Sequence, residues 1–94
     1  MSERAKILLL IVAQHTDRDW SSGEVKSFFV PNPGGYYVNG KQHFVSGAGD
    51  AKILRTLQLK GLIERPKTSL PNKYIYALTE DGLLVTQGID ETEL

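Results

Sequence analysis

The chain contains no cysteine among its 94 residues. It therefore has no disulfide framework, no thiolate metal ligand and no cysteine nucleophile. This composition suits a reducing compartment, and we expect a cytoplasmic protein. The longest apolar run, residues 7–13, is too short to span a bilayer and lacks the small-residue cleavage pattern of a signal peptide. We expect no association with a membrane.

The chain also lacks net charge, because 11 basic residues balance 11 acidic ones. This balance argues against strong non-specific nucleic-acid binding, which usually leaves a basic footprint. The charges are nevertheless unevenly distributed. Residues 41–73 hold seven basic and two acidic side chains, a net charge of +5, so the rest of the chain carries −5. The cations of this segment form either a binding surface or an ordinary solvated face.

Patterns typical of catalysis are absent from the sequence. His15 and His43 stand alone, and neither a nucleophile elbow nor a metalloprotease motif occurs. The glycine-rich stretch 46–50 opens a helix and could contact a phosphate, but it lacks the Gly-Lys-Ser/Thr ending of a nucleotide-binding loop. We therefore expect no enzyme activity, no cofactor and no metal site.

The most regular stretch of the chain is residues 46–65, which reads as a helix, a glycine stop and the start of a strand. Its apolar residues recur at helical spacing on one side. The opposite side carries Lys52, Arg55 and Thr56. The hydroxyl of Ser46 can cap the first turn. Gly61 stands where a left-handed residue would end the helix.

Two further helices are predicted ahead of this stretch. Residues 3–15, capped by Ser2, are apolar on every side in their second half, which is typical of a buried core helix. Residues 21–24, Ser-Ser-Gly-Glu, match a capping box. They predict a helix over residues 21–30, which Pro31 would end.

Residues 31–45 begin as a proline- and glycine-rich loop and continue as a hairpin. The dipeptide Asn39-Gly40 lies between strand-forming residues, and it predicts a two-residue turn because both turn positions need a positive φ. Three roles stay open for this insert. It could add a DNA contact, form a surface for a partner protein or a second copy, or cover the helix that follows it.

The C-terminal third predicts a strand, a turn, a returning strand and a last helix. The turn falls at residues 66–72 and the returning strand at residues 74–79. Thr79 can cap a helix over residues 80–87. Residues 1–88 then form one domain with its insert at 31–45, and the acidic tail, residues 89–94, is expected to fray.

Two motifs in this region resemble the winged helix-turn-helix superfamily, notably bacterial and archaeal regulators of the multidrug-resistance type. The motif Leu57-Gln-Leu-Lys-Gly-Leu-Ile-Glu-Arg65 is similar to the end of their recognition helix. The motif Tyr74-Ile-Tyr-Ala-Leu-Thr-Glu-Asp-Gly82 is similar to their last wing strand and final helix start. Residues 31–45 do not match, because such proteins usually join the two helices in three or four residues. The resemblance implies an α+β winged helix-turn-helix fold. That fold has a three-helix core, a two-stranded β-wing and a short C-terminal helix.

The resemblance also implies a prokaryotic transcription regulator that binds double-stranded DNA sequence-specifically. The helix after Ser46 would enter the major groove, and the wing would hold the backbone. The residues expected to contact DNA are Ser46, Lys52, Arg55, Thr56, Lys67, Lys73 and Lys41. Similar regulators usually dimerise, so a homodimer stays open.

The alternative is a winged-helix module that binds protein instead of DNA. Its surface would be the aromatic insert, with Tyr36, Tyr37 and Phe44. A basic face shared by the recognition helix and the wing would favour DNA. A recognition helix covered by the insert, by Glu64 or by the acidic tail would favour protein contacts.

Overall fold

Three helices and three antiparallel pairs of short strands make up the computed structural model, which describes residues 1–31, 35–67 and 74–94. In chain order, the elements are α1 (Glu3–Gln14), β1 (Asp17–Arg18), β2 (Val25–Ser27), β3 (Gly35–Val38), β4 (Lys41–Phe44), α2 (Gly47–Leu59), β5 (Ile63–Glu64), β6 (Ala77–Leu78), α3 (Glu80–Gln87) and a 3₁₀ turn (Glu91–Glu93). The strands pair as β1–β2, β3–β4 and β5–β6. The expected α+β class is confirmed.

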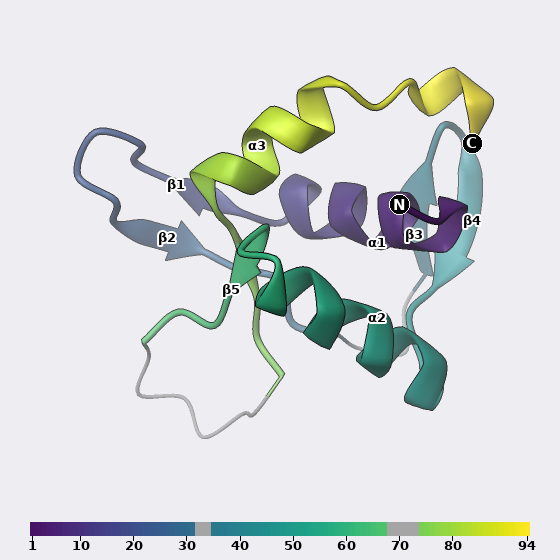
Figure 1. Ribbon diagram of the computed structural model, residues 1–94, viewed down its shortest axis with the longest axis horizontal. Coiled ribbons are helices and arrows are strands. Elements are labelled where there is room, and N and C mark those ends of the chain that lie inside the picture. The colour runs from purple at the N-terminus through teal and green to yellow at the C-terminus, as the bar shows by residue number, and fades with distance from the viewer. Residues whose placement is uncertain (32–34, 68–73) are drawn as a thin grey trace.

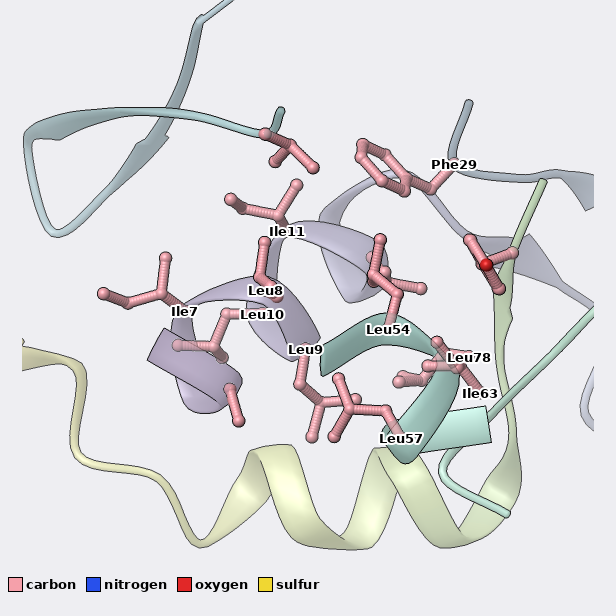
Figure 2. Packing of buried hydrophobic residues seen from close by; sticks show 14 of the residues in the cluster. Ile7, Leu8, Leu9, Leu10, Ile11, Phe29, Leu54, Leu57, Ile63 and Leu78 are labelled. Carbon is pink, nitrogen blue, oxygen red and sulfur yellow. The ribbon is translucent and has the colours of Figure 1, made fainter. Parts of the chain in front are cut away.

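Helix α1 is the centre of the core. It runs between α2 and α3, with the β1–β2 hairpin towards one end and the β3–β4 hairpin towards the other (Figure 1). All of residues 7–12 are buried, and Leu9, Ile11 and Val12 are fully so. Leu54 and Leu57 of α2 pack against this apolar surface, together with Phe29 (Figure 2). The Ser2 hydroxyl accepts from the Ala5 N–H at 3.1 Å, so the predicted core helix and its cap are confirmed.

The helix predicted over residues 21–30 is wrong, and a hairpin of β1 and β2 stands in its place. The serines of the apparent capping box form the turn of this hairpin. The Asp19 carboxylate accepts from the Ser21 N–H at 3.0 Å and from the Ser21 hydroxyl at 2.7 Å. Gly23 has a φ of 82°, which a right-handed helix does not allow. The Ser-x-x-Glu pattern is therefore also compatible with a hairpin turn, here one in which the preceding Asp19 accepts the hydrogen bonds of Ser21.

A distant partner then extends the chain after β2. The Phe29 N–H donates to the Tyr76 carbonyl at 2.8 Å, and the Tyr76 N–H donates to the Phe29 carbonyl at 2.9 Å. The Phe29 side chain is buried, with 1% exposed. Aromatic and β-branched residues suit such extended backbone, which explains why this segment does not form a helix.

The predicted hairpin in the insert is confirmed. Asn39 and Gly40 have φ values of 51° and 73°, and Val38 pairs with Lys41 across the turn. Its inner face buries Tyr36 and Val38 against the core that α1 dominates. The hairpin contacts both ends of α1, because Arg4 donates to the Phe44 carbonyl and Gln14 donates to the Tyr37 carbonyl. It does not lie over the outer side of α2 (Figure 1).

Helix α2 ends as predicted but begins differently. Gly61 has a φ of 76°, the Leu62 N–H donates to the Leu57 carbonyl at 3.1 Å, and the Gly61 N–H donates to the Gln58 carbonyl at 3.0 Å. These bonds form a Schellman stop. The predicted side-chain cap by Ser46 is wrong, because its hydroxyl makes no capping bond. Instead the Ser46 N–H donates to Asp50 Oδ2 at 3.0 Å.

The last helix follows the prediction. The Thr79 hydroxyl accepts from the Gly82 N–H at 3.0 Å and donates to the Gly61 carbonyl at 2.6 Å, which joins the start of α3 to the end of α2. The returning strand is shorter than predicted, with β6 confined to two residues. Part of the predicted turn, residues 68–72, lies outside the described residues.

The acidic tail, residues 89–94, packs back on the domain. It ends in a 3₁₀ turn, and Leu94 packs into the core with 6% of its surface exposed. The Lys41 amino group donates to the main-chain oxygen of Leu94 at 3.0 Å, which holds the tail against the β3–β4 hairpin. In the parts of the chain that the structure describes, none of the helices combines the length and apolar content needed to cross a bilayer.

Candidate nucleic-acid interface

The outer face of α2 is uncovered and carries no carboxylate. Besides glycines, its exposed residues are Ala48, Ala51, Lys52, Arg55, Thr56, Leu59 and Lys60, the last at the C-cap. Asp50 is the one acidic residue of this helix, and it faces inward with 9% of its surface exposed. Because the opposite side contributes Leu54 and Leu57 to the core, the helix presents its cations to solvent.

An ion pair fixes this helix against α1. Arg4 Nε donates to Asp50 Oδ1 at 2.9 Å, and Arg4 Nη2 donates to Asp50 Oδ2 at 2.7 Å. The same Nη2 also donates to the Phe44 carbonyl at 2.7 Å, where β4 ends. The hydrogen bonds from Arg4 lower the pKa of Asp50, and the same contact raises the pKa of Arg4. The pair joins α1, the insert and the start of α2 at one point.

The two flanks of the α2 face have different neighbours. Lys52, Thr56 and Lys60 line a groove of about 210 Å³ whose other wall is the beginning of α1, with Met1 and Ser2. The Thr56 hydroxyl donates to the Lys52 carbonyl at 3.0 Å, so it stays close to the helix. This flank therefore combines two lysines with an apolar groove, to which Ala5, Ile53 and Leu57 also contribute.

Arg55 lies on the other flank, towards the segment that returns to β6. Burial raises the pKa of the Tyr76 phenol, while the nearby charges of Arg65 and Arg55 lower it and Tyr74 raises it. Arg55 and Arg65 thus act on the same phenol from two different elements. Between α2 and this segment lies an apolar cleft of about 200 Å³, which Leu54, Tyr74 and Tyr76 help to line.

Arg65 and Tyr74 also belong to this surface, although neither is among the residues expected to contact DNA. Both are exposed. Arg65 directly follows β5, so its position next to that strand could have been predicted from the sequence. The approach of Tyr74 and Tyr76 to α2 depends on the pairing of Phe29 with Tyr76, which no local pattern indicates.

The other predicted contact residues are more scattered. Ser46 is exposed at the start of α2, beside the apolar cleft. Lys67 lines a separate polar cleft with Arg18 and Glu64, and Lys73 lies outside the described residues. Lys41 is not brought together with the cations of α2, because it sits at the hairpin turn and bonds the tail.

The Glu64 carboxylate, near the surface, is already engaged. Arg18 Nη1 forms a 2.7 Å ion pair with Glu64 Oε1, and it also donates to the Leu78 carbonyl at 3.0 Å.

Within residues 1–31, 35–67 and 74–94, no cluster of three histidine or acidic side chains could hold a metal ion. His15 packs at the end of α1 against Phe29 and Tyr36, with ring centroids 5.7 and 5.1 Å away.

These features define a small α+β domain with an exposed, carboxylate-free helix face. No family model, curated protein or solved structure matches the chain.

Proposed function

We propose that the protein binds double-stranded DNA sequence-specifically, as a transcription regulator in a prokaryotic cytoplasm, with α2 in the major groove. The outer face of α2 carries this proposal, because it is cationic, uncovered and free of carboxylates. A major groove admits an α-helix, and arginine or lysine can donate to guanine edges there. Because the net charge is zero, DNA would be bound by one confined basic surface, and the rest of the molecule would not attract it.

Three segments that could have covered α2 are engaged elsewhere, which favours DNA over a protein partner at this face. The insert packs on α1, Glu64 is paired with Arg18, and the tail is held at the insert by Lys41. Within the described residues, the outer face of α2 therefore stays accessible to a nucleic acid.

We also propose that the fold is a variant of the winged helix-turn-helix. The order of α1, α2, the β5–β6 pair and α3 agrees with such a domain. The β1–β2 hairpin would replace the second helix of the motif. The β5–β6 pair would then form the wing.

The proposed roles follow from position. Lys52, Arg55 and Thr56 would reach base edges, with Arg55 nearest the wing. Lys60, Arg65 and Lys67 would meet phosphates, which fix the register without reading sequence.

The test is fluorescence anisotropy on a labelled mixed-sequence duplex across a range of salt concentrations. The logarithm of the binding constant should fall linearly with the logarithm of the salt concentration. Lys60→Ala should reduce this slope by the amount expected for about one phosphate contact. Lys6→Ala is the matched control, because Lys6 lies on α1 beside the acidic tail. No binding at low salt by the folded protein would refute the proposal.

The insert supports a second candidate, an interface with a protein partner or a second copy. Tyr37 and Phe44 lie on the outer face of the β3–β4 hairpin, with 60% and 54% of their surfaces exposed. Analytical ultracentrifugation of the wild type and of Tyr37→Ser/Phe44→Ser tests self-association. A sedimentation coefficient that is monomeric in both proteins at high concentration would exclude the homodimer.

A further inference from the structure

Leu59 stands out on the outer face of α2. It has 77% of its surface exposed, more than any other large hydrophobic residue in the described parts of the chain. It follows Arg55 by four residues and Lys52 by seven, so the three side chains share one side of the helix. A large apolar side chain therefore projects from a helix face whose other exposed side chains are small or cationic.

A leucine left in water contributes no burial energy to the fold. Leu84 of α3 offers a comparison, because it is also exposed, at 62%, but its helix begins with Glu80 and Asp81 and carries no cation. Of the two, Leu59 alone is surrounded by side chains suited to a polyanion.

We propose that Leu59 contacts the 5-methyl group of a thymine and so makes the protein select thymine at one position of its site. This inference rests on the proposed function. In the major groove, thymine is the base that displays a methyl group, and apolar side chains read it by contact. Four residues advance a helix by about 6 Å. Base pairs are spaced by about 3.4 Å, so this thymine lies one or two base pairs from the base that Arg55 contacts.

The test begins with selection of a preferred duplex from a random pool. Each thymine of that duplex is then replaced singly by deoxyuridine, which removes the methyl group and leaves the hydrogen-bonding edges intact. Wild-type protein should bind about fourfold more weakly when the critical methyl is removed, the loss expected for one buried carbon. Leu59→Ala should bind the thymine and deoxyuridine duplexes equally, whereas the control Leu84→Ala should retain the fourfold difference.

The outcomes separate this inference from the proposed function. A selected duplex with no methyl-sensitive thymine would overturn the role of Leu59 while leaving DNA binding intact. The same holds if Leu59→Ala keeps the sensitivity of the wild type. Failure of the wild type to bind any duplex at low salt would overturn both. Because Leu59 is exposed, its replacement should leave the circular dichroism spectrum and melting temperature unchanged.

Discussion

The ion pair between Arg4 and Asp50 should be a major determinant of stability, and Asp50→Asn is the sharpest perturbation of it. The Asp50 carboxylate accepts two hydrogen bonds from Arg4 and one from the Ser46 N–H. In asparagine, an NH₂ group replaces one of the two carboxylate oxygens. That group is a donor and would face the N–H donors of Arg4 and Ser46 without accepting from them. The substitution is nearly isosteric, so its cost reports charge and hydrogen bonding, with little change in packing.

The expected cost lies between two limits. Breaking a fully buried pair costs about 3–5 kcal/mol, and an exposed pair contributes about 0.2–1 kcal/mol. The Asp50 side chain is 12% exposed, but that of Arg4 is 35% exposed and can recover water. We therefore expect a loss of about 2 kcal/mol in the free energy of unfolding at pH 7. For a domain of this size, the melting temperature should fall by roughly 8–16 °C.

The pH dependence supplies the decisive assay. The pKa of Asp50 is lowered in the folded state, so its charge stabilises the fold above the unfolded pKa of about 3.9. That contribution is lost as pH falls through the lower, folded pKa. Urea denaturation, followed by circular dichroism, should show a constant gap between wild type and Asp50→Asn from pH 7 to about 5. The gap should close below about pH 4.

Two controls separate the pair from its surroundings. Asp17→Asn removes the same charge from an exposed strand residue and should change stability by less than about 0.5 kcal/mol. A double-mutant cycle with Arg4→Met should give a coupling energy of about 1 kcal/mol or more. A coupling energy near zero, or a gap that persists unchanged to pH 3, would refute the reasoning.

Four further substitutions test other parts of the structure. Gly82→Ala should destabilise the fold by about 1–3 kcal/mol in urea denaturation, because its Cβ would collide with the Leu62 carbonyl oxygen. Gly49→Ala, a matched change in open space, should stabilise it by about 0.5–1 kcal/mol. Leu9→Ala should lower the free energy of unfolding by about 2–5 kcal/mol, since this side chain is fully buried in α1. Thermal melts measure this loss, and a smaller one would contradict the prediction. Arg55→Ala should weaken binding to a selected duplex by about 1–3 kcal/mol with an unchanged circular dichroism spectrum, and equal affinity would remove Arg55 from base recognition.

Elements with strong local signals were predictable from the sequence. The left-handed stop at Gly61, the Asn39-Gly40 turn and the Thr79 cap each depend on residues within one turn of the chain, and the structure contains all three. The cationic side of α2 was predictable for the same reason, because helical spacing alone separates Lys52 and Arg55 from the buried leucines.

The remaining features depend on partners far away in the sequence. Ser21 to Glu24 satisfy a capping box and a hairpin turn equally well, and the pairing of Phe29 with Tyr76 decides between the two. The same pairing brings Tyr76 to the flank of α2. Asp50 likewise has no local signal for its role, since its partner Arg4 is 46 residues away.

The groove beside α2 has a practical consequence for how this protein is handled. Met1 and Ser2 form one wall of it, opposite Lys52, Thr56 and Lys60. A purification peptide joined ahead of Met1 would therefore emerge next to the surface that we propose for DNA. An acidic peptide there would occupy the lysines in place of phosphate, and a basic one would add affinity of its own. Binding constants should be compared before and after such a peptide is cleaved away.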